Sequence, residues 1–170
     1  MTLVSTVTVG AGGASQIEWS SIPQSGKDLL VVSSVRTDRN TGGYGDGMSF
    51  RFNGDSGFNY AVQVLWGIPG DSPAAYGQSL TSRDNVNAGS ANDIATTNSA
   101  FSSMQTFIAN YTAASNKSLS TESVIENNGT RSILQMQAGG WAGGAITSLR
   151  LFSFNQTLQQ GSTASLYIIS

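Results

Sequence analysis

Hydrophobic and polar residues alternate at every second position along much of this chain, and this rhythm constrains its fold more than any other feature. Met48, Phe50 and Phe52 alternate with polar residues, and residues 104–111 repeat the pattern. Successive side chains of a β-strand point to opposite faces of a sheet, so a period of two indicates strands with two different faces. No window of twelve residues shows a helical stripe, and only residues 98–104 suggest one short helical turn. The chain is therefore predicted to be all-β.

About ten short antiparallel strands are expected, because runs of apolar and β-branched residues are separated by clusters of Gly, Asn, Asp and Ser. So many short strands in one chain favour a single-domain β-sandwich or jelly roll. The expected strands are residues 2–9, 16–19, 28–37, 47–52, 60–66, 91–96, 103–112, 117–126, 131–137, 146–154 and 162–169.

Two of the turns between these strands predict hairpins. The Asn53-Gly54 step suits positive φ, so the strands at residues 47–52 and 60–66 are expected to pair with each other. The sequence Asn-Asn-Gly-Thr at residues 127–130 predicts a second hairpin between the strands that flank it.

The chain is long enough for one domain with a hydrophobic core, which we place at residues 15–170. Residues 1–14 are predicted to be an N-terminal strand or arm, because a glycine-rich step at residues 10–13 separates them from the rest. Such an arm can pair with the sheet edge of a neighbouring molecule. The alternative is that it forms the first strand of its own sandwich.

The composition excludes several classes of function. Cysteine and histidine are both absent, which excludes disulfides, thiolate zinc sites and a serine triad. The net charge is −2 and the basic residues are scattered singly, so nucleic-acid binding is not expected. The N-terminus lacks the features of a secretory signal, and no apolar stretch approaches the roughly 20 residues of a membrane span. We expect an intact small product made in a cytoplasm, with no cofactor; the alternative is a fragment of a larger protein.

Two loops are candidate contact regions. Residues 36–47 combine cations, carboxylates and glycines with one aromatic residue, Tyr44, which together with Asp46 could contact a ligand or partner. The alternative is a mobile connection between strands. Residues 67–89 are polar and predict a long loop, which either carries function or covers a sheet edge.

Trp141 is the third candidate contact residue. Two glycines precede it and Gly143 and Gly144 follow one residue later, so its indole is expected to be accessible and able to stack on a sugar ring. The alternative is a tryptophan that caps the end of the core.

No metal site and no catalytic residue are predicted. Asp38, Asp46 and Asp55 could surround a calcium ion, but no EF-hand spacing is present, and acidic residues in turns also bind backbone N–H groups. Asp93, Glu122 and Glu126 lie in or near expected strands, yet no spacing singles out the carboxylate pair that a glycosidase needs.

Six short motifs occur in order along nearly the whole chain. They are Trp-Ser-Ser-Ile-Pro at residues 19–23, Asp-Leu-Leu-Val-Val at 28–32, Phe-Asn-Gly-Asp at 52–55 with Asn-Tyr at 59–60, Phe-Ile-Ala-Asn-Tyr at 107–111, Ala-Ile-Thr-Ser-Leu-Arg-Leu-Phe at 145–152 and Gly-Ser-Thr-Ala-Ser-Leu-Tyr-Ile-Ile at 161–169. Together they resemble the motifs of bacteriophage virion proteins that carry a β-sandwich domain. Such domains usually end in Leu-Tyr-Gly-Ile, whereas Ile168 replaces the glycine here, so the geometry of the last strand is expected to differ.

The resemblance implies a structural or adhesive component of the virion surface, with no catalytic residues to carry over. A stand-alone sandwich with little charge implies a head decoration, or cement, protein: a homotrimer seated on the major capsid protein. Charged residues make up 11% of the chain, against roughly 25% in an average domain, and uncharged polar groups cost less to desolvate at an interface. The alternative is a tail-fibre module that recognises host glycan, and the third hypothesis is a polysaccharide-cleaving enzyme.

Each hypothesis predicts a different surface. A cement protein should present a flat, uncharged base. An adhesin should present exposed aromatic residues and carboxylates in one groove. An enzyme should show two carboxylates converging in a cleft, one of them with a raised pKa.

Overall fold

The computed structural model describes residues 1–41, 45–68, 75–126 and 132–170, which form twelve strands and no helix. None of these residues therefore forms a helix long and apolar enough to cross a membrane. The strands are β1 (Thr2–Thr8), β2 (Gln16–Trp19), β3 (Asp28–Ser34), β4 (Asp46–Phe52), β5 (Tyr60–Gly67), β6 (Ala75–Arg83), β7 (Val86–Ala91), β8 (Ser103–Ile108), β9 (Lys117–Ile125), β10 (Ile133–Trp141), β11 (Leu149–Ser153) and β12 (Thr163–Ile169).

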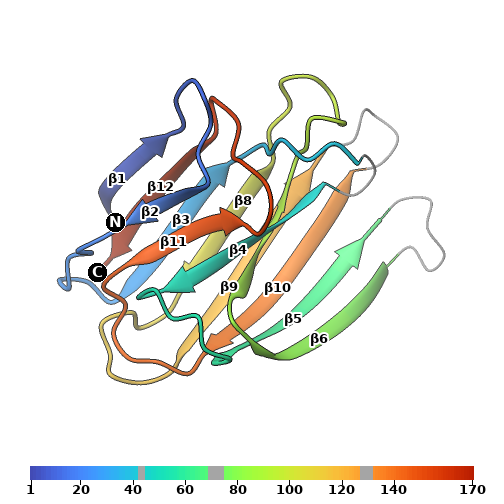
Figure 1. Cartoon of the computed structure of the whole chain (residues 1–170). Helices are drawn as coiled ribbons and strands as arrows, with labels where there is room; N and C mark the ends of the chain where they lie inside the picture. The colour runs from blue at the N-terminus through green and yellow to red at the C-terminus, as the bar shows by residue number, and fades with distance from the viewer. Residues whose placement is uncertain (42–44, 69–74, 127–131) are drawn as a thin grey trace.

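The strands form two antiparallel sheets that stack as a β-sandwich, so the predicted fold class is confirmed. The large sheet has eight strands in the order β1-β12-β3-β8-β9-β10-β5-β6, and the small sheet has four in the order β2-β11-β4-β7. Figure 1 shows the small sheet lying over the large one, with β5 and β6 extending beyond it. The alternation of hydrophobic and polar residues thus produces two layers, because strands such as β8, β9 and β12 bury one face against the other sheet.

The hydrophobic core lies between the two sheets. β9 shows the pattern most clearly, with buried and exposed residues alternating over all nine positions. Each fully buried large aliphatic or aromatic side chain contributes roughly 1.5–3 kcal/mol through removal from water. The largest buried side chains are Tyr60, Tyr111, Phe50, Phe52, Ile17, Leu29, Met48, Ile108, Ile125, Ile133, Ile146 and Leu149.

The first predicted hairpin is wrong, although its two strands are present. β4 pairs with β11 and β7 in the small sheet, whereas β5 pairs with β10 and β6 in the large sheet. Asn53 and Gly54 do adopt positive φ, but their turn carries the chain from one sheet to the other. The second predicted hairpin is confirmed, because β9 pairs with β10 over nine positions; its turn at residues 127–131 lies outside the described residues.

The long loop predicted at residues 67–89 is wrong, because β6 and most of β7 lie there. β6 is exposed at most positions on both faces, so no apolar alternation marks it in the sequence. β7 is buried at five of its six positions and is built of small residues, which allow it to pack against β9 and β10.

Two smaller predictions are also wrong. Residues 92–96 are not a strand, because the Asp93 carboxylate accepts a hydrogen bond from the N–H of Ala95 and turns the chain after β7. Residues 98–104 contain no helical turn; a single turn ends at Ala100, and β8 begins at Ser103.

The N-terminal segment belongs to the sandwich. β1 pairs with β12 at one edge of the large sheet, and Val9 continues the contact by donating its N–H to the Ser162 carbonyl at 2.8 Å. Ala14 forms a further bridge with Leu158. The segment is thus the first strand of its own sheet, with one edge unpaired within the described residues.

Candidate functional site

The three predicted contact residues do not form one site. Tyr44 lies outside the described residues. Asp46 is the first residue of β4, while the Trp141 indole packs on Phe52 at the other end of that strand, with ring centroids 5.3 Å apart. Six steps of about 3.3 Å along a strand separate these ends by about 20 Å.

Asp46 is engaged inside the sandwich. Its side chain is buried, and its Oδ2 accepts a hydrogen bond from the Ser153 hydroxyl at 2.6 Å. The bond joins the start of β4 to the end of β11, so the carboxylate holds two neighbouring strands of the small sheet together.

Trp141 is buried, so the prediction of an accessible indole is wrong. Only 4% of the residue is exposed, and its ring packs against those of Phe52 and Tyr60, which also contact each other. Gly143 folds back so closely onto the indole that a Cβ atom there would overlap it. The glycines that suggested accessibility therefore allow the chain to cover the ring, and Trp141 caps the end of the core.

Four of the six motifs quoted in the sequence analysis meet at this end of the sandwich. The Asn53 amide oxygen accepts hydrogen bonds from the N–H groups of Thr147 and Ser148 at 2.8 and 3.0 Å, and its NH₂ donates to the Ala145 carbonyl at 2.8 Å. One side chain from the Phe-Asn-Gly-Asp motif thus clamps the Ala-Ile-Thr-Ser motif almost a hundred residues later.

Two more motifs join the same clamp. The N–H of Ile22 donates to the Thr147 carbonyl at 2.9 Å, and the N–H of Ile146 donates to the Tyr111 carbonyl at 2.8 Å. The Tyr111 hydroxyl in turn donates to the carbonyl of Pro23. The four motifs therefore share a structural role, which is to hold one end of the sandwich together. We call this end the clamp end.

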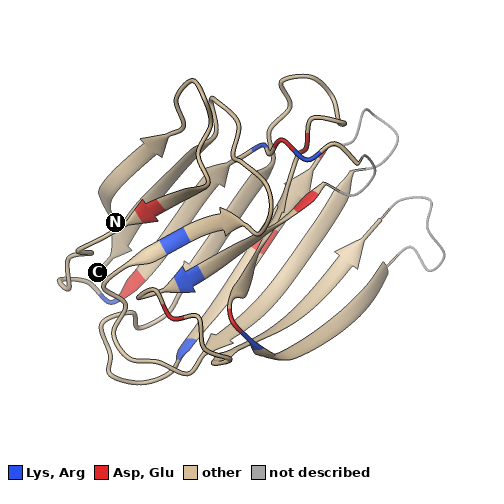
Figure 2. Cartoon of the chain, viewed as in Figure 1, with Lys and Arg blue, Asp and Glu red and all other residues tan. Residues whose placement is uncertain are grey.

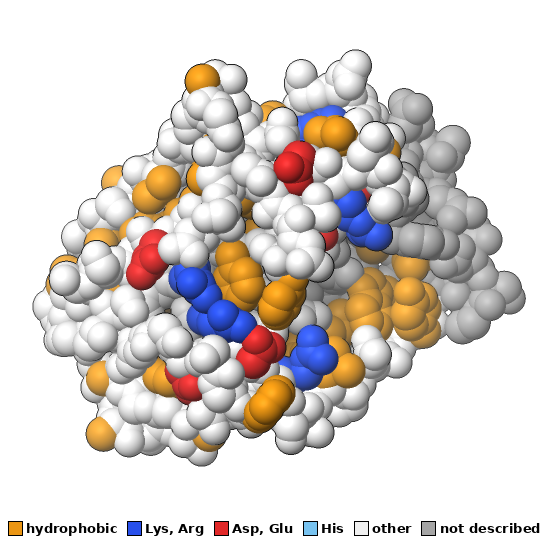
Figure 3. Space-filling view, viewed as in Figure 1, with side chains coloured by type: hydrophobic (Ala, Val, Ile, Leu, Met, Phe, Trp, Pro, Cys, Tyr) orange, Lys and Arg blue, Asp and Glu red, His pale blue; other side chains and the backbone are white. Residues whose placement is uncertain are grey.

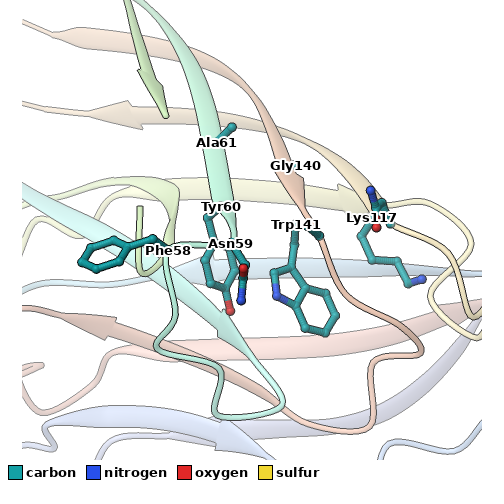
Figure 4. A pocket seen from close by; sticks show the side chains of 9 residues that line it. Phe58, Asn59, Tyr60, Ala61, Lys117, Gly140 and Trp141 are labelled. Atoms are coloured by element: carbon teal, nitrogen blue, oxygen red, sulfur yellow. The ribbon is translucent and has the colours of Figure 1, made fainter. Parts of the chain in front are cut away.

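A shallow cavity of about 350 Å³ opens beside the clamp end (Figure 4). β5 and β10 supply the aromatic wall through Tyr60 and Trp141, and Lys117 lies at the other side. Phe58 in the preceding loop is 76% exposed, and the neighbouring Asn59 is also exposed. The cavity therefore offers one accessible aromatic ring and one amide to a ligand.

The ionisable groups beside this cavity are committed to internal contacts. The Trp141 indole N–H donates to Asp55 Oδ2 at 2.8 Å, and this bond, with further bonds from Asn59 and Gly57, holds the pKa of Asp55 below its usual value against the opposing effect of burial. Burial raises the pKa of Tyr60 to about 12. Both phenol and carboxylate therefore keep one protonation state near neutral pH.

Lys117 is a buried cation at the start of β9. Its Nζ donates hydrogen bonds to the carbonyls of Ala113 and Ser115, and burial lowers the pKa of its ammonium group. The ammonium group bonds to carbonyl groups of the turn before β9, so it does not act as a free general acid or base in the cavity.

The acidic residues considered for metal or glycosidase chemistry do not converge. Asp55 lies at the clamp end, whereas Asp38 accepts a bond from the Thr157 N–H beyond the other end of the small sheet. Asp93 is fully buried and Glu122 is exposed on the large sheet. Among the described residues, no group of three carboxylates could hold a metal ion.

The most extensive exposed surface is the side of the large sheet that faces away from the core, which we call the large-sheet face. Seven of the twelve exposed large hydrophobic residues of the described chain lie on it. They are Leu3, Val32, Leu65, Phe107, Val124, Leu134 and Met136.

Charge is almost absent from this face. Asp28 and Glu122 are the charged side chains of the described residues that point outward within it, and the Asp28 carboxylate already accepts the N–H of Asn110. Figure 2 shows the strands of the large sheet almost free of charge. Eight strands about 4.8 Å apart span about 34 Å, and at about 23 Å long they cover about 770 Å², close to the roughly 800 Å² that each partner buries in a standard interface.

Comparisons with protein-family models, curated proteins and solved structures gave no match.

Sequence reasoning missed the large-sheet face and found only part of the clamp end. A signal for the face was present, because Leu134 and Met136 are apolar although they alternate with buried Ile133, Gln135 and Gln137 on the same strand. No sequence pattern indicates the hydrogen bond between Trp141 and Asp55. The two residues are 86 positions apart, and their contact depends on the crossover of the chain between the sheets.

Proposed function

We propose that this chain is a non-enzymatic structural protein of a phage virion, a decoration protein that seats its large-sheet face on the major capsid protein. The observation that carries the proposal is that this face is almost uncharged and carries seven exposed large hydrophobic residues. The resemblance of the clamp-end motifs to virion proteins supplies the biological context, the virion surface, and the expectation of a homotrimer.

The physics of the large-sheet face favours a permanent contact. Burying its exposed Leu65, Leu134 and Met136 would remove apolar area from water at about 25 cal/mol per Å². The serine and glutamine side chains between them cost little to desolvate if they find hydrogen-bond partners. Exposed hydrophobic residues gathered on one face favour an interaction site there over a surface that stays in water.

The number of copies per particle tests this proposal. Quantitative mass spectrometry of purified virions, calibrated against the major capsid protein, should find hundreds of copies in a simple ratio to the capsid subunit. A few copies, or a few tens, would place the protein on the tail and refute decoration. Absence from the particles would refute the virion assignment.

The clamp-end cavity favours one second candidate, a tail-fibre module that binds host glycan. Exposed Phe58 could stack on a sugar ring while Asn59 bonds to its hydroxyl groups. Phe58→Ala should then abolish glycan binding while the fold stays intact, because the side chain is exposed. Unchanged binding to a neutral glycan, or no binding by the parent protein, would refute this candidate.

A further inference from the structure

A charged and aromatic cluster lies on the side of the small sheet that faces away from the core, which we call the small-sheet face. Arg150 on β11 lies directly opposite Arg51 on β4, so two guanidinium groups share one face. Their Cζ atoms lie 4.9 and 5.1 Å from the centroid of the Phe152 ring. Figure 2 shows basic residues on the adjacent strands β4 and β11, and Figure 3 shows basic side chains beside hydrophobic ones on this face.

The two arginines differ in the hydrogen-bond and charge partners of their guanidinium groups. Arg51 forms an ion pair with Asp84 and also donates its Nε–H to the Asp84 carbonyl at 2.9 Å. No nitrogen of Arg150 has a hydrogen-bond acceptor among the described residues, and its Nε is buried. Like charges directly opposite each other destabilise a sheet, so Arg150 leaves a positive charge that an anion would neutralise.

The neighbouring carboxylate of Glu18 does not form an ion pair with Arg150. Glu18 lies opposite Arg150 on β2, but its carboxylate accepts a hydrogen bond from Gln16 at 2.6 Å. Within the described part of the chain, the Arg51 pair is the sole contact between opposite charges at 4.0 Å or less. The Arg150 guanidinium therefore keeps its hydrogen-bond donors for a group from outside.

An exposed aromatic ring completes the cluster. Phe154 is 51% exposed and packs edge-on against buried Phe152, with ring centroids 5.3 Å apart. A planar guanidinium binds a carboxylate through two parallel hydrogen bonds, and an aromatic face accepts the apolar C–H face of a ring. A carboxylate on a pyranose ring combines the two groups that this chemistry would bind.

We propose that Arg150, Arg51 and Phe154 form a binding site for a carboxylated sugar of the uronic-acid class. The carboxylate bonds to the Arg150 guanidinium, Arg51 flanks the site with its charge already paired to Asp84, and the sugar ring lies against Phe154. The small-sheet face points away from the large-sheet face, so docking through the large sheet leaves this site open. The inference does not depend on the proposed function, because it is tested on the isolated chain.

The test is an NMR titration of the isolated protein with sodium glucuronate, and with glucose and sodium acetate as separate probes of the ring and the charge. Glucuronate should bind saturably and at least ten-fold more tightly than either probe, and added salt should weaken it. Binding of glucuronate no tighter than acetate would reduce the site to a non-specific anion contact and overturn the proposal, as would equal binding of glucose.

Two variants should change the affinity for glucuronate in opposite directions. Arg150→Gln should weaken glucuronate binding at least ten-fold, whereas Glu18→Gln should tighten it about two-fold by removing a nearby negative charge. Lys27→Gln removes one positive charge from an exposed loop residue and serves as the matched control, with unchanged affinity. Unchanged binding in Arg150→Gln would overturn the proposal. If that variant fails to fold, Glu18→Gln decides: weaker or unchanged binding there refutes the site.

Discussion

Asn53→Ala tests the clamp end most sharply, because this one side chain connects two distant motifs. Its amide oxygen accepts bonds from the Thr147 N–H, the Ser148 N–H and, at 3.2 Å, the Thr147 hydroxyl, while its NH₂ donates to Ala145. Its backbone has φ 53°, a left-handed conformation that asparagine tolerates better than alanine.

The expected loss of stability follows from these contacts. Four exposed hydrogen bonds at the low end of their usual range, about 0.5 kcal/mol each, give about 2 kcal/mol. The positive φ adds about 1 kcal/mol for alanine. The total of about 3 kcal/mol corresponds to a fall in Tm of about 10 °C for a domain of this size.

Urea unfolding followed by circular dichroism measures this free energy. Asn53→Gly keeps the positive φ accessible, so it should lose only the hydrogen-bond part, about 2 kcal/mol. Asn98→Ala is the matched control, since Asn98 is exposed and has no side-chain hydrogen bond among the described residues; it should cost less than about 0.5 kcal/mol. A loss below about 1 kcal/mol in Asn53→Ala would refute the clamp.

Three further predictions follow from the same structure. Trp141→Phe removes the indole bond and should raise the pKa of Asp55 in an NMR titration. The folded pKa of Asp55 is depressed, so Asp55 stabilises the fold at pH values above its unfolded pKa of about 3.9. This stabilisation is lost as the pH falls through the folded pKa, and it should be smaller in Trp141→Phe. Gly143→Ala should displace the indole, costing about 1–3 kcal/mol with a change in tryptophan fluorescence; native-like emission would contradict the packing. Met136→Lys should leave stability within about 0.5 kcal/mol but abolish particle binding, whereas Phe58→Lys, away from that face, should retain it; equal binding by both would contradict the docking face.

The strands were readable from the sequence because their burial alternates, as in β9 and β12, where one face supports the core. β6 was not readable, since a strand exposed on both faces needs no apolar pattern and is defined by its pairing with β5. The sequence correctly predicts the positive φ of the Asn53-Gly54 turn. It does not predict that the strands on either side of the turn belong to different sheets, because the asparagine side chain bonds to residues 145–148 across the sandwich.

The same division applies to the candidate sites. The glycines around Trp141 predict an accessible indole, with the end of the core as the alternative, and the alternative holds because Gly143 folds over the ring, which local composition does not specify. Asp46 was singled out as an unusual acidic residue, yet its partner Ser153 lies on a strand more than a hundred residues later. Arg150 was noted only as one scattered cation, because its position opposite Arg51 requires the strand register.

Hydroxyl-radical footprinting of purified particles tests the central claim most directly, because it reports which side chains solvent reaches in the assembled state. Oxidation of Met136 and Phe107 on the large-sheet face should fall several-fold in particles relative to the free protein. Oxidation of Phe154 on the small-sheet face should stay the same. Equal oxidation of Met136 in both states, or protection of Phe154 instead, would contradict docking through the large sheet.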